Sequence, residues 1–282
     1  MSDRVAVVGA GTMGSGIAQV ALEAGFTVTI VDTDEQFFLR GINTIKSFIG
    51  KKVEKGKLSR EQYEDIQSRL SGTTDMAAGV AGAVMVVEAV YENLELKKEI
   101  FRKLDALCPE NVILASNTST MSISEIAAVV GHPDRVIGTH YFSPVPLMRL
   151  VEIVKGEKTS EDIVAKTMEL CRRFGKTPIA VKDVPGFIVN RYLCLMYNEA
   201  ANMVYDGVAE AGDIDSALKL GCNWPMGVCQ IMDMAGVDIT CNALQSLYAM
   251  TGEERYKPSP LFEQMLEANT LGQKTGKGFY EY

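Results

Sequence analysis

The chain has 282 residues, 47% of them hydrophobic and 23% charged, and its formal net charge is −8. This length allows one large domain or two unequal ones. The negative charge argues against proteins that bind nucleic acids or anionic membranes, because both need a basic surface. Six cysteines without paired spacing indicate reduced thiols. An apolar strand follows the first residues at once, and no apolar run is long enough to cross a bilayer, so we expect a cytoplasmic protein without a targeting peptide.

The first part of the chain alternates strand-like and helix-like segments. Residues 14–25 have a helical period and end in glycine, whereas the segments on either side are short, apolar and rich in β-branched residues. Such alternation predicts an α/β fold with a doubly wound, largely parallel sheet. The predicted strands are residues 4–10, 26–32, 84–90, 112–117, 135–142 and 149–156.

Two further segments are predicted to be helical. Residues 33–83 are longer than a simple crossover needs and contain two helical patterns that meet at 55–57, which predicts an inserted helical hairpin. From about residue 187 onward the periodicity is helical throughout. We therefore expect a nucleotide-binding domain over residues 1–184 and a smaller, all-helical domain over residues 185–282.

A glycine pattern points to the nucleotide. Gly9, Gly11 and Gly14 form GxGxxG between a predicted strand and a predicted helix, where glycines let a diphosphate approach the backbone and the helix N-terminus attracts it. Asp32 ends the second predicted strand, where a carboxylate accepts the ribose hydroxyls of NAD and repels the 2′-phosphate of NADP. The alternative is a glycine turn with a surface aspartate. The predicted NAD contacts in this Rossmann-type domain are Gly9, Ala10, Gly11, Thr12, Met13, Gly14 and Asp32.

One of the only two histidines, His140, lies at the end of the apolar run VIGTHYF. If residues 136–142 and 150–156 pair as antiparallel strands about Pro146, His140 lies opposite Glu152 on the same side of the sheet. A carboxylate at Nδ1 fixes the tautomer and makes Nε2 the nitrogen that exchanges a proton with a substrate hydroxyl. The pattern predicts the acid/base residue of a hydride-transfer enzyme, with a structural His–Glu pair as the alternative.

Polar residues also follow another predicted strand. Asn117 and Ser119 of LASNTS lie at the carboxyl edge of the predicted sheet, where ligands bind in this fold class, although such residues also cap helices. Asn190 of PGFIVNR lies one turn into the first helix of the second domain, where it is either a ligand contact or a surface residue.

Seven motifs carry a resemblance to a known family. They occur in this order: GAGTMGSGIAQ, EAVYENLELKKEIF, ILASNTST, GTHYFSPVPLMRLVEIV, DVPGFIVNR, LKLGCNWPMG and KTGKGFYEY. Over essentially its full length the chain resembles the L-3-hydroxyacyl-CoA dehydrogenase family, most of all its bacterial 3-hydroxybutyryl-CoA members. The resemblance implies NAD-dependent interconversion of an L-3-hydroxyacyl-CoA and its 3-ketoacyl-CoA in fatty acid and butanoate metabolism.

The resemblance also implies roles for individual residues. His140 would be the acid/base and Glu152 its partner, while Ser119 and Asn190 would hold the substrate oxygen and the thioester. Ser143 stands where the family usually has asparagine, and Trp224, Val228 and Cys229 replace residues that are more often histidine, proline and an aliphatic residue. The implied contacts of the nicotinamide half of the cofactor are Glu92, Lys97, Asn117, Ser119, Ser143 and Lys274.

CoA carries several phosphate charges, so a protein of net charge −8 needs a local positive patch to bind it. Lysines cluster in the predicted hairpin, and we expect Lys51 and Lys52 to contact CoA, together with Lys97 and Ser119. The alternative is the solvated basic face of an ordinary helix.

The second predicted domain is small, and its segment YLCLMYNEAANMVY is apolar on more than one helical face. Such a helix must be covered on several sides, and a second copy of the chain would cover one of them. We therefore expect at least a homodimer joined through this domain.

Two other functions fit the same scaffold: another hydroxy-acid or sugar-acid dehydrogenase, or a non-catalytic NAD-binding protein. The joint presence of His140, Glu152, Ser119 and Asn190 argues against the second. We expect no metal site.

Overall fold

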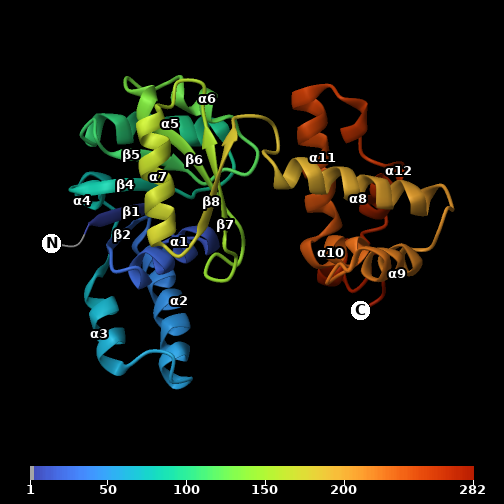
Figure 1. Cartoon of the computed structure of the whole chain (residues 1–282), viewed down its shortest axis with the longest axis horizontal. Helices are drawn as coiled ribbons and strands as arrows, with labels where there is room; N and C mark the ends of the chain where they lie inside the picture. The colour runs from blue at the N-terminus through green and yellow to red at the C-terminus, as the bar shows by residue number, and fades with distance from the viewer. Residues whose placement is uncertain (1–2) are drawn as a thin grey trace. The chain divides into compact units, whose positions relative to one another are not determined.

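A computed structural model describes residues 3–282 of the chain, which folds as two units that divide between Val184 and Pro185 (Figure 1). The first unit contains a sheet with helices, and the second unit is helical. The predicted fold class is confirmed.

The sheet of the first unit has the strand order β3-β2-β1-β4-β5-β6-β7-β8. Neighbouring strands are parallel except for β6 and β7, which pair antiparallel. The carboxyl ends of β1, β2, β4, β5 and β6 therefore share one edge, which is where ligands bind in doubly wound sheets. The strands are β1 (Arg4–Val8), β2 (Thr27–Val31), β3 (Leu70–Thr73), β4 (Ala83–Glu88), β5 (Ile113–Ser116), β6 (Val136–Tyr141), β7 (Leu150–Lys155) and β8 (Thr177–Lys182).

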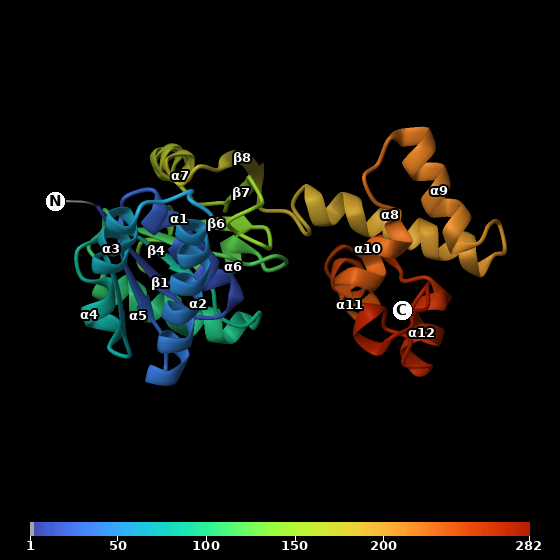
Figure 2. The same cartoon turned by 90° about the horizontal axis from the view of Figure 1, so that it is seen from below.

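Helices cover both faces of this sheet, with α7 and α5 on opposite sides (Figure 2). One face packs against apolar residues of α1, α2 and α7, such as Ile17, Ile42 and Cys171. The helices are α1 (Thr12–Glu23), α2 (Glu35–Glu54), α3 (Arg60–Ser68), α4 (Met76–Val80), α5 (Leu94–Leu107), α6 (Ile123–Ala127) and α7 (Glu161–Arg173), with a 3-10 turn η1 (Pro133–Arg135).

Helices α2 and α3 form the predicted hairpin. Helix α2 ends at Glu54, and α3 begins at Arg60 behind a capping box in which Ser59 and Gln62 bond each other's backbone. Strand β3 follows the hairpin and was not among the predicted strands, because its sequence LSGT is short and largely polar.

The second unit is made of α8 (Val189–Tyr205), α9 (Ala211–Cys222), α10 (Val228–Ala235), α11 (Val237–Thr251) and α12 (Pro260–Glu267), with 3-10 turns η2 (Glu254–Tyr256) and η3 (Gln273–Thr275). Its core gathers buried apolar residues of all five helices, among them Met232, Leu244 and Phe262.

Two buried aspartates hold the C-terminal tail of this unit. Asp233 accepts hydrogen bonds from the N–H groups of Phe279 and Tyr280, each at 2.9 Å, and from the Tyr282 hydroxyl at 3.1 Å. Asp215 accepts one from the Tyr280 hydroxyl at 2.7 Å. Both aspartates are 1% exposed, so these bonds are shielded from water and keep the tail against α9 and α10.

Candidate functional site

The turn between β1 and α1 fits a bound diphosphate. Gly9 has a φ of +104°, and a Cβ at this position would lie 2.6 Å from the carbonyl oxygen of Ala89, while a Cβ at Gly14 would lie 1.9 Å from that of Gly9. At Gly11, in contrast, the space is open. Helix α1, which Thr12 and Met13 begin, has no side-chain cap and no acidic residue in its first turn. Its N-terminal dipole can therefore act on an anion.

Asp32 follows β2 and lies beside this turn. Its Oδ2 accepts a hydrogen bond from the Ala10 N–H at 2.7 Å, and its Oδ1 accepts one from the Thr33 N–H at 2.7 Å. The carboxylate therefore ties the end of β2 to the glycine turn.

His140 and Glu152 lie opposite each other in the antiparallel pair β6–β7, in the predicted register. The His140 Nδ1 is 2.7 Å from the Glu152 Oε2, and the two residues are 4% and 0% exposed. The ring of Phe142 packs on the imidazole with 4.5 Å between ring centroids. A buried carboxylate thus orients a buried imidazole near the carboxyl edge of the sheet.

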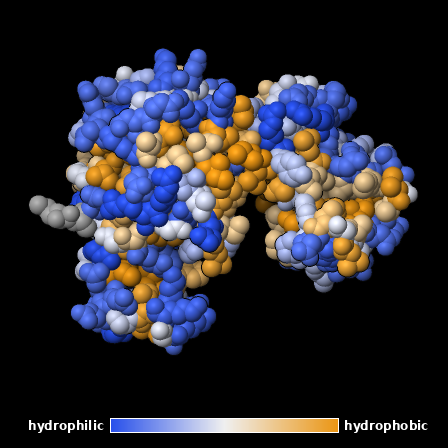
Figure 3. Space-filling model, viewed as in Figure 1, coloured by the Kyte–Doolittle hydropathy of each residue, from blue (hydrophilic) through white to orange (hydrophobic). Residues whose placement is uncertain are grey.

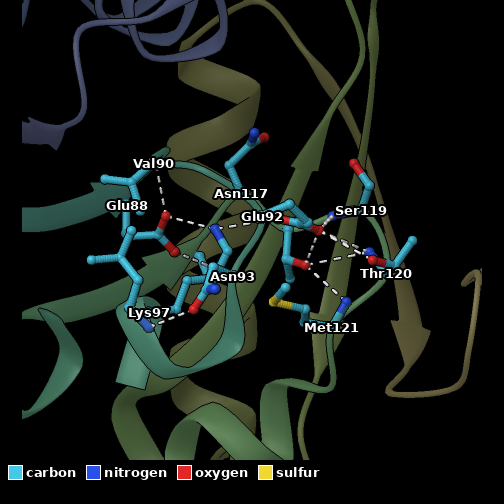
Figure 4. Close-up of polar contacts among 12 residues, drawn as sticks. Glu88, Val90, Glu92, Asn93, Lys97, Asn117, Ser119, Thr120 and Met121 are labelled. Carbon is cyan, nitrogen blue, oxygen red and sulfur yellow. Dashed lines mark hydrogen bonds and ion pairs between the residues drawn. The ribbon is translucent and has the colours of Figure 1, made fainter. Parts of the chain in front are cut away.

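A buried ion pair lies where β4 ends (Figure 4). The Lys97 ammonium is 2.7 Å from the Glu88 Oε1, and both residues are 0% exposed. The same Glu88 oxygen accepts the Val90 N–H at 2.8 Å, and its other oxygen accepts the Ser116 hydroxyl at 2.6 Å. This network joins α5 to the ends of β4 and β5. Lys97, assigned to cofactor and CoA from the sequence, presents no exposed surface here.

Glu92 holds the turn that follows β5 (Figure 4). Its Oε1 accepts hydrogen bonds from the Thr118 hydroxyl at 2.6 Å and from the N–H groups of Ser119 at 2.8 Å and Thr120 at 3.2 Å. Its Oε2 is 3.3 Å from the Lys97 ammonium. Burial raises the pKa of Glu92, but the charge of Lys97 and these hydrogen bonds outweigh it, so its pKa lies below the ordinary value. The carboxylate is therefore ionised near neutral pH.

Asn117 and Ser119 lie close to β6 on the same edge. The Asn117 side-chain oxygen accepts the Tyr141 N–H at 3.0 Å, next to His140 in sequence, and the Asn117 N–H donates to the Glu88 carbonyl at 2.8 Å. Ser143 follows β6 and is exposed. The structure thus brings the predicted residues Glu92, Asn117, Ser119 and His140 to one edge of the sheet.

The remaining predicted residues lie in the second unit. Asn190 is half-buried in the first turn of α8, and the Lys274 ammonium is 2.5 Å from the Asp238 carboxylate. Cys229 is 0% exposed, and burial and the nearby Asp215 raise the pKa of its thiol, so it stays protonated in the core of this unit. Trp224 packs against the same core.

The hairpin lysines differ from one another. The Lys52 ammonium pairs with Glu23 of α1 at 2.7 Å, whereas Lys51 is exposed and lies over the ring of Phe48, 5.6 Å from its centroid. Phe48 and Arg40 line a surface hollow of about 670 Å³ along α2. Of the two lysines, Lys51 is therefore the more accessible to a ligand.

Asp183 has a structural role that the sequence analysis did not find. Its carboxylate accepts hydrogen bonds from the Ser122 hydroxyl at 2.8 Å and from the N–H groups of Ile123 at 3.1 Å and Ser124 at 2.7 Å. It thereby fixes the start of α6, directly after the turn held by Glu92. Its position before a proline in DVPGF was the available signal.

Residues 3–282 contain neither a membrane-spanning helix nor a metal-binding cluster. Within this range no helix combines the length and apolar character needed to cross a membrane, and no group of three or more histidine, cysteine, aspartate and glutamate side chains is arranged to hold a metal ion.

Comparison with known families covers nearly the whole chain. The model of the 3-hydroxyacyl-CoA dehydrogenase NAD-binding domain matches residues 4–184, and that of the 3-hydroxyacyl-CoA dehydrogenase C-terminal domain matches residues 186–282.

Individual relatives agree with these matches. The chain is 42% identical to a probable 3-hydroxybutyryl-CoA dehydrogenase of Bacillus subtilis, over 99% of this chain and 97% of the relative. It is 42% identical to the mitochondrial hydroxyacyl-coenzyme A dehydrogenase of Rattus norvegicus, over 99% and 90% of the two chains. The crystal structure of (S)-3-hydroxybutyryl-CoA dehydrogenase from Ralstonia eutropha superposes with a TM-score of 0.96 at 40% identity, covering 100% of this chain and 99% of the other.

Proposed function

This chain belongs to the 3-hydroxyacyl-CoA dehydrogenase family, and we propose that it interconverts L-3-hydroxybutyryl-CoA and acetoacetyl-CoA, with His140 as the acid/base. Membership of this family establishes that the chain is an NAD-dependent 3-hydroxyacyl-CoA dehydrogenase. The Bacillus and Ralstonia relatives, which are named as 3-hydroxybutyryl-CoA dehydrogenases, favour the four-carbon acyl group. The observation that carries the proposed mechanism is the buried His140–Glu152 pair, 2.7 Å between Nδ1 and Oε2.

In the direction of oxidation, the alcohol loses a hydride from C3 and a proton from its oxygen. NAD, when bound, accepts the hydride. His140 takes the proton and becomes an imidazolium, which the adjacent, buried Glu152 carboxylate stabilises. In reduction the imidazolium returns the proton to the ketone oxygen.

The other predicted residues would position the two ligands. Asp32 would accept the ribose hydroxyls of NAD beside the glycine turn, and the turn held by Glu92 would present Ser119 toward the nicotinamide end. We assign the substrate oxygen and the thioester to Ser119 and Asn190, and the closing contact on the cofactor to Lys274.

The proposed substrate is tested by NADH oxidation with acetoacetyl-CoA. We expect rapid consumption of NADH, slower consumption of NADPH because of Asp32, and none with free acetoacetate. Longer 3-ketoacyl-CoA esters measure the chain-length preference. Absence of turnover with all of these thioesters would overturn the proposal, and a higher kcat/KM for long chains would overturn the four-carbon assignment.

The exposed Lys51 of the helical hairpin gives a second prediction, which concerns CoA binding. Lys51→Glu should raise the KM for acetoacetyl-CoA by about fivefold, since it reverses an exposed charge beside Phe48, which lines the hollow on α2. The KM for a short acetoacetyl thioester without the nucleotide should change much less. Lys103→Glu on α5, where the lysine is also exposed, is the matched control. An equal rise in KM for both thioesters would count against CoA binding at Lys51.

We further propose a homodimer joined through the second unit. Apolar side chains reach the surface of this unit (Figure 3), and Leu220, Val208 and Tyr192 are 87%, 68% and 62% exposed. Exposed apolar area of this kind marks an interaction surface. Light scattering should give about twice the chain mass of 30.7 kDa, and a mass of one chain from an active sample would exclude the dimer.

A further inference from the structure

Glu88, Lys97 and Glu92 form a connected Glu–Lys–Glu triad that carries one more negative than positive charge. The Lys97 ammonium lies 2.7 Å from Glu88 and 3.3 Å from Glu92. Within residues 3–282, Lys97 is the one cation that forms an ion pair with either carboxylate. Three polar groups contact the Glu88 carboxylate: the Val90 N–H, the Lys97 ammonium and the Ser116 hydroxyl. Counted by formal charges, two carboxylates and one ammonium give the triad a net charge of −1.

The triad is shielded from water on one side and open on the other. Glu88 and Lys97 are fully buried, whereas the Glu92 side chain is 37% exposed. Water and salt screen a charge less when it is partly buried. The excess charge can therefore act on a ligand that lies against Glu92.

The strand order places the triad at the nicotinamide half of the cofactor. In this fold a dinucleotide lies across the carboxyl edge, with its diphosphate at the first strand and its adenosine ribose at the end of the second. Asp32 follows the end of β2, on one side of β1, and Glu88 ends β4, on the other side. Ser116, which bonds Glu88, ends β5 one strand further. The side of β1 away from Asp32 is thus the side of the nicotinamide.

The two redox states of the cofactor differ in charge at this end. The nicotinamide ring of NAD+ carries one positive charge. A hydride from the substrate C–H brings two electrons and a proton to the ring, so that NADH has a neutral ring and otherwise the same charges. A fixed negative charge nearby stabilises the cationic ring and has little effect on the neutral one.

We propose that the Glu–Lys–Glu triad makes this site favour NAD+ over NADH, and that Glu88 is a specificity-determining residue that acts by its charge without touching the cofactor. The inference rests on NAD binding and the strand order, and is independent of the acyl-CoA substrate.

The test is to titrate the full-length protein with NAD+ and with NADH by calorimetry, without substrate, and to compare the two dissociation constants. Glu88→Gln neutralises the triad at a fully buried position. We expect it to lower the ratio Kd(NADH)/Kd(NAD+) by about fivefold. Glu92→Gln, at a partly exposed position, should lower the ratio in the same direction and serves if the buried variant does not fold.

Structural damage alone would weaken the binding of NAD+ and of NADH to the same extent, and would leave the ratio of their dissociation constants unchanged. Glu95→Gln is the matched control, because Glu95 lies on the same helix as Lys97, is 76% exposed and pairs with Lys98. The ratio of the two dissociation constants in this variant should equal that of the native protein. A native ratio in both Glu88→Gln and Glu92→Gln would overturn the inference, even if the protein turns over acetoacetyl-CoA. Conversely, a shifted ratio in a protein inactive on acyl-CoA esters would support the triad and overturn only the proposed function.

Discussion

Turnover by His140→Gln is expected to fall by about three orders of magnitude, while the affinity for NADH stays close to that of the native enzyme. Glutamine can keep a hydrogen bond to Glu152, but its neutral amide cannot exchange a proton with the substrate oxygen, and acid–base catalysis contributes about 10²- to 10⁴-fold. The kcat for acetoacetyl-CoA reduction and the Kd for NADH measure the two effects separately.

The second histidine provides the control. His132 is 45% exposed and lies 3.2 Å from Glu110, among surface carboxylates, so His132→Gln should keep native kinetics. Glu152→Gln should give an intermediate loss of kcat, because it removes the charge that stabilises the imidazolium but leaves the ring in place. A near-native kcat for His140→Gln would show that another group carries the proton.

Asp233→Ala is expected to destabilise the second unit by about 3 kcal/mol. The change leaves the N–H groups of Phe279 and Tyr280 without their acceptor, and each orphaned buried donor costs about 1–3 kcal/mol. The Tyr282 hydroxyl also loses this acceptor, but Tyr282 is 55% exposed and can bond to water instead. For a unit of this size such a loss lowers the melting temperature by roughly 15 °C. Thermal unfolding followed by circular dichroism measures it.

Hydrogen exchange of the same variant locates the loss. The amides of Phe279 and Tyr280 should lose protection first, ahead of those in α11. Asp213→Ala is the control, since Asp213 is an exposed residue of α9. Unchanged protection of the tail in Asp233→Ala would mean that other contacts hold it.

The sequence predicted the features that depend on local periodicity. Alternating apolar segments located six of the strands, and the even spacing of His140 and Glu152 predicted their pairing, because side chains in a strand alternate between its faces. The glycine pattern was equally readable, since it lies within a single turn. Strands β3 and β8 were not predicted. The four residues of β3 contain no apolar run, and β8 has a proline as its second residue, which argues against a strand.

The sequence did not predict that Lys97 is buried, and the reason is a different one. Lysine is rarely buried unless it is paired, and its partner Glu88 lies on another element. A signal did exist, because Lys97 continues the buried stripe of Ile100, Phe101 and Leu104 on α5. The carboxylate that lies beneath this stripe is revealed only by the packing of α5 against the end of β4, which the local sequence does not show. Asp183 was missed likewise, since its partners begin 61 residues earlier.

The antiparallel ladder of β6 and β7 also determines where this protein tolerates a change in chain length. In the connection between the two strands, Phe142 packs on His140 and Val145 is buried, whereas Leu147 and Met148 are 75% and 43% exposed. The exposed part can therefore change in length while His140 and Glu152 stay opposite each other. A single residue inserted within either strand would instead turn one of the two side chains to the other face. Changes of length are therefore tolerated at the exposed part of the connection, and not in the buried strands beside it.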